Sequence, residues 1–279
     1  MADTTTDDLT RQVLDAYART PGPRLRELLE SLTRHLHAFA VETKLTTQEW
    51  RAGIDFLTAT GHKCDRERQE FVLLSDVLGL SSLVEEINAA PGATESTVLG
   101  PFYVPDAPVR ANGEQIGRPQ DGSPTLVHGV VTDLAGTPLP GATVDVWQGS
   151  GNGLYDTQDP DQPRFNLRGI FVADAEGRYE FRTVRPASYP IPTDGPVGGL
   201  LRAAHRNHWR AAHIHAIVSA SGHRQVTTHV FDSQNPYLHS DAVFGVKDSL
   251  VRDFRPAGPA DPPDVTYVTE MNFALAPAI

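Results

Sequence analysis

Residues 210–220 read Arg-Ala-Ala-His-Ile-His-Ala-Ile-Val-Ser-Ala, a short apolar run with the composition of a β-strand. Side chains alternate between the two faces of a strand, so His213 and His215 are predicted to share one face. Two imidazoles on one face can bind a single metal ion in adjacent coordination positions. A strand whose polar face merely happens to hold two histidines is the alternative, and this motif alone does not separate the two interpretations.

Strand character extends along the chain from about residue 89 onward. Gly and Pro recur every few residues there, and the apolar runs are short, alternating and rich in Val, Thr and aromatic residues. We expect strands at residues 125–134, 142–148, 177–184, 212–220, 224–231 and 265–273. Most are separated by Gly-containing turns, which predicts a β-sandwich with long loops.

Before residue 90, apolar residues recur at helical spacing and Gly and Pro are sparse. The expected helices cover about residues 9–17, 25–36 and 46–61, then about 66–77 from Arg66 onward, and a short stretch after Gly79 that carries Leu83 and Ile87. Thr46 and Glu49 have the spacing of a capping box. The predicted fold class is mostly β, with an α-helical N-terminal domain at residues 1–100 and a β-sandwich domain at residues 101–279.

Composition excludes several classes of function. The 279 residues carry a formal net charge of −11, which repels nucleic acid and anionic lipid surfaces. The single cysteine, Cys64, allows neither an intrachain disulfide nor a metal site built on thiolates, and it fits a reducing cytoplasm. No apolar run approaches the roughly 18 residues of a membrane span, and the first residues do not have the pattern of an export signal.

Five motifs together resemble those of one known family. They are Leu99-Gly-Pro-Phe-Tyr103, Gly153-Leu-Tyr155, Phe165-Asn-Leu-Arg168, Tyr189-Pro-Ile-Pro-Thr-Asp-Gly-Pro and Arg210-Ala-Ala-His213-Ile-His215. In this order they resemble the intradiol ring-cleavage dioxygenases, in particular their hydroxyquinol and chlorocatechol branch, over about residues 10–275. The resemblance implies a homodimer formed through the N-terminal helices, with phospholipid bound there in some members. The apolar spacing from Leu25 to Leu36 independently suggests an interface.

The resemblance also implies a metal centre. One Fe(III) per chain would be bound by Tyr155, Tyr189, His213 and His215, and anionic phenolate oxygens suit this hard cation. Tyr189 would act both as a ligand and as a base, and Arg210 would orient the substrate and stabilise its developing negative charge.

This sequence departs from the family pattern at two positions near that centre. Ala211 stands where Pro is common, and His229 stands where Gln is frequent. We expect His229 to hydrogen-bond behind the ligands rather than to be a fifth ligand.

The substrates implied are O2 and a small aromatic diol or triol. The residues expected to contact the ring are Leu73, Asp76, Val98, Leu99, Gly100, Pro101, Phe102, Ile191, Pro192, Arg210 and Val243. Leu73 and Asp76 are three residues apart and so share a helical face. A buried carboxylate needs a hydrogen-bond partner, and the third hydroxyl of hydroxyquinol (benzene-1,2,4-triol) is one, which favours this substrate over catechol or chlorocatechol.

Two other classes of protein remain open from the sequence. One is a non-enzymatic β-sandwich binding module, in which the histidines are incidental. The other is a ferrous oxygenase whose triad combines His213 and His215 with a carboxylate such as Asp232.

Overall fold

The computed structural model describes residues 4–65 and 68–278, and the chain divides into two compact units between Ala59 and Thr60. This boundary lies inside a helix, whereas the change in composition near residue 90 follows the helical region, so the domain boundary expected at residue 100 stays a prediction. Within the described ranges, no helix combines the length and the apolar character needed to cross a bilayer.

Helices α1 and α2 lie in the first unit, and the other helices follow along the chain. The helices are α1 (Thr4–Tyr17), α2 (Pro23–Thr43), α3 (Thr47–Lys63), α4 (Glu70–Val77), α5 (Leu80–Ile87) and α6 (Pro196–Ala203). The predicted capping box is present, since the Thr46 amide donates to Glu49 Oε2 at 2.8 Å and the Glu49 amide donates to Thr46 Oγ1 at 3.2 Å. On α2, the side chains of Leu25, Leu28 and Leu32 remain about half exposed.

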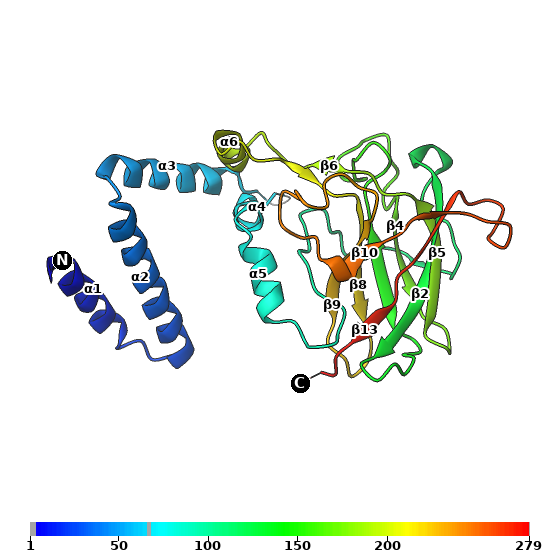
Figure 1. Ribbon diagram of the computed structural model, residues 1–279, viewed down its shortest axis with the longest axis horizontal. Coiled ribbons are helices and arrows are strands. Elements are labelled where there is room, and N and C mark those ends of the chain that lie inside the picture. The colour runs from blue at the N-terminus through cyan, green and yellow to red at the C-terminus, as the bar shows by residue number, and fades with distance from the viewer. Residues whose placement is uncertain (1–3, 66–67, 279) are drawn as a thin grey trace. The chain divides into compact units, whose positions relative to one another are not determined.

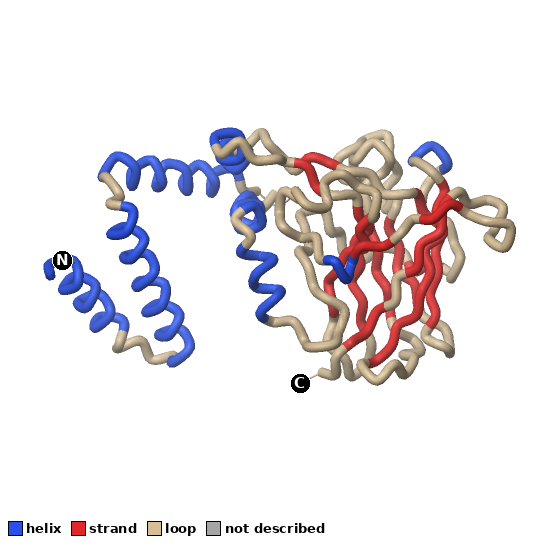
Figure 2. Tube along the Cα trace, in the orientation of Figure 1, coloured by secondary structure: helices blue, strands red, loops and turns tan. Residues whose placement is uncertain are grey.

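The strands of the second unit form two main sheets (Figures 1 and 2). The larger sheet has the order β1 (Val109–Arg110), β4 (Arg168–Val172), β3 (Thr143–Trp147), β8 (His213–Ser219), β9 (Val226–Asp232) and β10 (Val251–Arg252). The smaller has the order β11 (Arg255–Pro256), β12 (Tyr267–Glu270), β2 (Pro124–Asp133) and β13 (Phe273–Leu275), and β5 (Arg178–Val184) also pairs with β2. A separate ribbon joins β6 (Tyr189–Pro190) to β7 (Trp209–Arg210).

One apolar core lies between the two main sheets. It contains Val144 and Ile214 from the larger sheet together with Val127 and Phe181 from the smaller one. The predicted mostly β architecture with an N-terminal helical region is therefore confirmed. Figure 1 shows α4, α5 and α6 lying together on one side of the strands.

Two expectations about individual elements were wrong, and one helix was missed. The strand expected at residues 265–273 is two strands, β12 and β13, because the chain leaves the β2 ladder at Met271, whose amide donates to His128 O. The helix expected from Arg66 begins at Glu70, and Arg66 itself lies outside the described residues. Helix α6 was not predicted, since Gly198 and Gly199 disfavour a helix locally.

Candidate metal centre and substrate cavity

The two histidines of the first motif lie on β8, in the middle of the larger sheet. His213 Nε2 and His215 Nε2 are 3.1 Å apart, and both side chains are buried. His215 is paired in the sheet with Trp147 on β3 and with His229 on β9. The Trp147 ring stacks on the His215 ring with centroids 4.6 Å apart, which constrains the plane of that imidazole. The two histidines therefore share one face, as their spacing predicts.

Two tyrosines lie beside these histidines. Tyr155 lies in the loop between β3 and β4, and its hydroxyl is 3.0 Å from His215 Nε2. Tyr189 opens β6, pairs with Arg210 on β7 and hydrogen-bonds to Tyr155. Gly153 has a φ of +81°, and an added Cβ there would lie 3.1 Å from the Tyr189 Cβ. Glycine at this position therefore allows the two tyrosine loops to approach each other.

Burial sets the protonation of all four side chains. It raises the pKa of the Tyr155 and Tyr189 phenols, lowers the pKa of His213 to about 3 and holds that of His215 well below its usual value. His213 Nδ1 donates to Ala211 O at 2.6 Å, so His213 Nε2 carries the free lone pair. Both histidines are thus neutral imidazoles, the form that binds metals.

The chemistry of this donor set fits a ferric ion. Two imidazole nitrogens and two phenol oxygens meet in a buried space, where the phenolate forms are unfavourable without a positive charge. A bound cation would supply that charge and lower the pKa of both phenols. Hard anionic oxygens match a hard, highly charged cation better than thiolates or thioethers do.

His229 lies against both histidines of β8. Its ring stacks on that of His213 with centroids 4.4 Å apart and meets that of His215 nearly edge-on at 4.2 Å. One potential ligand atom from each of the three histidines falls within a group no more than 4.8 Å across, so the three together could hold a metal. His229 Nδ1 is 3.5 Å from Arg210 Nη2, and His229 Nε2 is buried without a hydrogen-bond partner. Its expected place behind the ligands stays a prediction.

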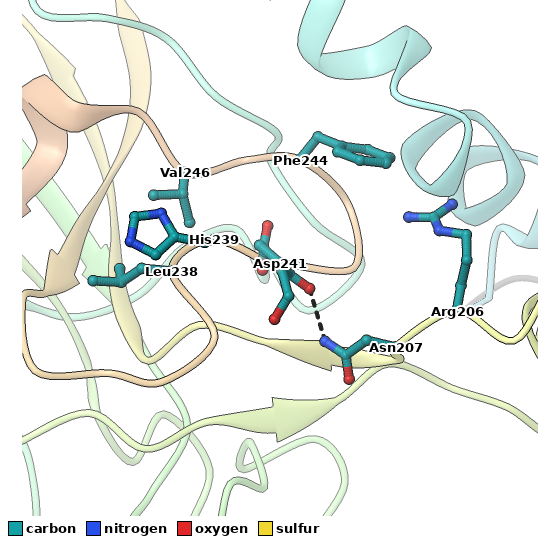
Figure 3. A pocket seen from close by; sticks show the side chains of 8 residues that line it. Arg206, Asn207, Leu238, His239, Asp241, Phe244 and Val246 are labelled. Atoms are coloured by element: carbon teal, nitrogen blue, oxygen red, sulfur yellow. Dashed lines mark hydrogen bonds between the residues drawn. The ribbon is translucent and has the colours of Figure 1, made fainter.

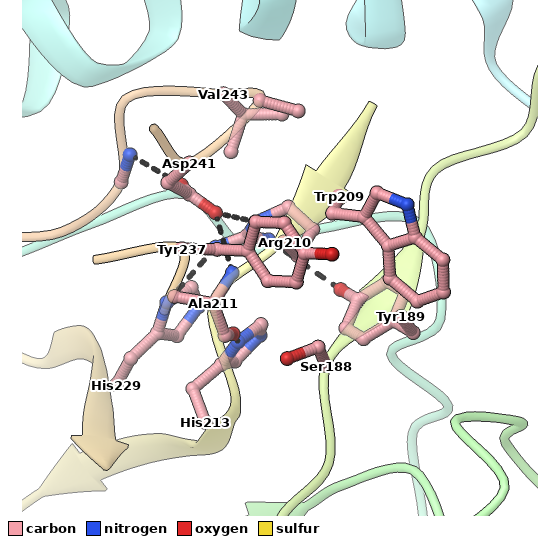
Figure 4. Close-up of polar contacts among 12 residues, drawn as sticks. Ser188, Tyr189, Trp209, Arg210, Ala211, His213, His229, Tyr237, Asp241 and Val243 are labelled. Atoms are coloured by element: carbon pink, nitrogen blue, oxygen red, sulfur yellow. Dashed lines mark hydrogen bonds and ion pairs between the residues drawn. The ribbon is translucent and has the colours of Figure 1, made fainter. Parts of the chain in front are cut away.

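Arg210 is held by a buried carboxylate that the sequence did not single out. Arg210 Nε donates to Asp241 Oδ1 at 2.9 Å, while Arg210 Nη1 is 3.4 Å from the Tyr189 hydroxyl (Figure 4). Burial alone would raise the pKa of Asp241, but Arg210 and the amide of Gly245 hold it below its usual value. The guanidinium is therefore anchored at one edge, with its outer nitrogens toward Tyr189 and His229.

Five of the predicted substrate-binding residues line one cavity of about 560 Å³. They are Asp76, Val98, Leu99, Gly100 and Pro101. The Asp76 side chain is 3% exposed, hydrogen-bonds to Ser81 and leaves Oδ1 buried without a partner. Burial raises the pKa of Asp76. A residue that lines this cavity thus carries a buried polar atom that lacks a hydrogen-bond donor.

The other predicted contacts lie around this cavity or next to the tyrosines. Leu73, Ile191 and Val243 pack with Val98 in one apolar cluster, and Pro192 is half-buried just beyond β6. The Phe102 ring stacks on that of Tyr155 with centroids 4.6 Å apart, so Phe102 covers a predicted ligand.

A second cavity, of about 330 Å³, borders Asp241 from the side of Arg206 and Phe244 (Figure 3). Asn207 Nδ2 donates to Ser240 O at 2.7 Å beside it. Its lining includes none of the predicted substrate-binding residues. Asp76 and four other expected ring contacts thus line the first cavity rather than this one.

Comparison with known proteins covers almost the whole chain. Residues 98–277 match the family model described as Dioxygenase, and residues 22–95 match Catechol dioxygenase N terminus. The chain belongs to the intradiol catechol dioxygenase family. The N-terminal region is of the type that this family uses for dimerisation.

Several relatives in this family are close. Hydroxyquinol 1,2-dioxygenase from Rhizobium sp. is 51% identical over 84% of this chain and 80% of its own length. 6-Chlorohydroxyquinol 1,2-dioxygenase from Cupriavidus pinatubonensis is 46% identical over 98% of both chains. The crystal structure of hydroxyquinol 1,2-dioxygenase from Pseudomonas putida DLL-E4 superposes with a TM-score of 0.92 at 47% identity over 99% of both chains.

Membership of the family excludes a non-enzymatic binding module. The structure also argues against a ferrous site that uses His213, His215 and Asp232. This dioxygenase family uses iron, and the buried histidine group can hold a metal. Asp232, the carboxylate of the ferrous alternative, instead forms an ion pair with Arg185 at 2.6 Å. The Asp232 carboxylate is thus already paired with the Arg185 guanidinium.

Sequence analysis missed two residues that contact the site, Trp147 and Asp241. Trp147 directly precedes the Gly-rich loop that carries Tyr155, so its position beside a predicted ligand was a usable signal. Asp241 is 31 residues from Arg210 in a loop without a motif. Its role is visible only in the folded chain.

Proposed function

We propose that this dioxygenase cleaves hydroxyquinol with O2 between the two adjacent hydroxyl-bearing carbons. The product would be 3-hydroxy-cis,cis-muconate, which tautomerises to maleylacetate in aromatic catabolism. The observation that carries the choice of substrate is the unpartnered Oδ1 of Asp76, a residue that lines the same cavity as Gly100 and Pro101. A ring hydroxyl para to one of the reacting hydroxyls would supply the missing donor.

We propose that Tyr155, Tyr189, His213 and His215 bind one Fe(III) per chain. A bound ferric ion would supply the Lewis acidity and redox capacity that make a deprotonated diol reactive toward O2. The support from this chain is the buried donor set, with hydroxyl and imidazole atoms 3.0 to 3.1 Å apart.

The side chains around this centre have separate roles. Binding of the diol requires loss of its hydroxyl protons, and the Tyr189 oxygen is positioned to accept one of them. Arg210 lies 3.4 Å from that oxygen, and its permanent positive charge would stabilise negative charge on Tyr189 and on the substrate. Phe102 and Trp147 cover Tyr155 and His215 and so exclude water from two of the ligands.

We also propose that the chain is a homodimer through its N-terminal helices and that phospholipid binds there. The half-exposed leucines of α2 support an interface, because isolated proteins rarely expose a continuous apolar stripe. A cytoplasmic location fits the single cysteine.

Oxygen uptake on hydroxyquinol, catechol and 4-chlorocatechol tests the proposed substrate. We expect the highest kcat/KM for hydroxyquinol, with a ring-opened dicarboxylate as product. Catechol or chlorocatechol 1,2-dioxygenase activity is the alternative, because solved relatives with these names share the fold at 26 to 29% identity. A higher kcat/KM for 4-chlorocatechol would favour that alternative.

A further inference from the structure

We propose that Asp241 is a positioning residue for ring cleavage, which acts by fixing the guanidinium of Arg210 against the reacting substrate. The inference rests on the proposed role of Arg210. It adds a residue to which neither the sequence motifs nor the comparisons point.

The first observation is the way in which Asp241 holds Arg210. Both side chains are about 2% exposed, and Arg210 Nε donates to Asp241 Oδ1 at 2.9 Å. Among the described residues, this is the ion pair that Arg210 makes. Because Nε is the inner nitrogen of the guanidinium, this contact leaves Nη1 and Nη2 uncommitted to a carboxylate. They lie 3.4 Å from the Tyr189 hydroxyl and 3.5 Å from His229 Nδ1.

The second observation is that backbone amides fix the Asp241 carboxylate itself. Asp241 Oδ1 also accepts from the Ala211 amide at 3.0 Å, and Asp241 Oδ2 accepts from the Gly245 amide at 2.9 Å. Figure 4 shows these contacts converging on one carboxylate. The oxygen that holds Arg210 therefore has little freedom to move. A donor fixed before the reaction stabilises developing charge without having to reorganise.

The third observation is that space around the guanidinium is restricted. A Cβ added at Gly245 would lie 3.1 Å from Arg210 Nη2 and 3.1 Å from Thr97 Oγ1. Thr97 in turn donates to Gly245 O at 2.9 Å, which fixes the Asp241–Gly245 loop beside Thr97. Carboxylate and loop thus hold the guanidinium from two sides.

The test is a double-mutant cycle of Asp241→Asn and Arg210→Gln, with kcat and KM measured on hydroxyquinol. If Asp241 acts through Arg210, Asp241→Asn lowers kcat by about 10²-fold, the scale expected for a misplaced catalytic group. KM should change much less, because the lost interaction belongs to the transition state. In the Arg210→Gln background, the same substitution should change kcat by less than about threefold, since coupled residues are not additive.

Measurements besides activity separate a loss of Arg210 positioning from a loss of folding or of bound iron. Iron content, the visible absorption of the isolated protein and the melting temperature are measured for each variant. Asp232→Asn is the matched control, because Asp232 is also a buried carboxylate that accepts a hydrogen bond from an arginine, with Arg185 Nε 2.6 Å from Asp232 Oδ2. Arg185 does not belong to the proposed site. We expect this control to lower the melting temperature without the loss of kcat.

Each outcome decides the proposal. Full kcat in Asp241→Asn, or an equal loss of kcat in the wild-type and Arg210→Gln backgrounds, would overturn it. If Asp241→Asn does not fold, Asp241→Glu keeps the charge and displaces the carboxylate, and a kcat within threefold of the wild type there would also overturn it. A wild type that cleaves none of the three diols would instead reject the proposed function.

Discussion

Replacing Asp76 by alanine removes a buried carboxylate oxygen without a hydrogen-bond donor from a residue that lines the proposed substrate cavity. With catechol bound, this oxygen stays unpaired, whereas the third hydroxyl of hydroxyquinol would donate to it. A hydrogen bond to a charged group that is lost in a buried site costs about 1.5–3 kcal/mol. At about 1.4 kcal/mol per factor of ten, the wild type should prefer hydroxyquinol over catechol by about ten- to a hundredfold in kcat/KM.

The assay is oxygen uptake by the wild type and Asp76→Ala on both diols. We expect kcat/KM for hydroxyquinol to fall by about ten- to a hundredfold in the variant, while that for catechol stays constant or rises, since an unpaired carboxylate is removed. Glu85→Ala is the matched control, because Glu85 lines the same cavity but is partly exposed to solvent. An unchanged ratio in Asp76→Ala, or an equal change in Glu85→Ala, would refute the assignment of Asp76.

Three further predictions concern the metal site, the pH dependence of stability and the N-terminal helices. Gly100→Ala places a Cβ 3.2 Å from His215 Cε1 at a φ of +75°, so we expect this variant to bind less iron than the wild type. Gly92→Ala is the control, because Gly92 has a similar φ of +80° but no atom within 4 Å of an added Cβ. Equal iron contents in the two variants would contradict the prediction. Burial raises the pKa of Asp145 to about 6, so the folded state loses stability as the pH rises from about 4 to 6. Asp145→Asn should therefore stabilise the protein more at pH 8 than at pH 4, by on the order of 1 kcal/mol because the carboxylate is partly exposed. Thermal melting at both pH values measures this, and equal gains in stability would contradict the prediction. Light scattering should give twice the 30.3 kDa of one chain for the wild type and a lower mass for Leu32→Glu on α2, and a monomeric wild type would reject the proposed dimer.

Local patterns predicted the elements whose signal lies within the sequence of the element itself. The capping box at Thr46 and the alternation that places His213 and His215 together each depend on residues a few positions apart. The division of the last predicted strand depends instead on a distant position. At Gly129 an added Cβ would lie 1.9 Å from Met271 O, a close approach that a local pattern does not encode.

The site could be predicted to the extent that it lies in motifs. Tyr155 and Tyr189 became candidates through the resemblance of their segments to one family. The structure brings the Tyr155 hydroxyl to His215 and hydrogen-bonds Tyr189 to Tyr155. Asp241 could not be predicted, because its importance comes from contacts with Arg210 and Ala211, about 30 residues away. The unpaired oxygen of Asp76 likewise follows from burial, although the resemblance to the family made Asp76 an expected ring contact.

The central claim is that two tyrosinates and two histidines hold a ferric ion, and visible absorption with iron analysis tests it most directly. We expect about one iron per wild-type chain and a tyrosinate-to-iron charge-transfer band that shifts when hydroxyquinol is added without O2. Tyr155→Phe and Tyr189→Phe should each alter or abolish the band. Tyr179→Phe should keep it, because that buried hydroxyl donates to Met271 O at 2.6 Å outside the site. A wild-type band that persists unchanged in both ligand variants would contradict the account.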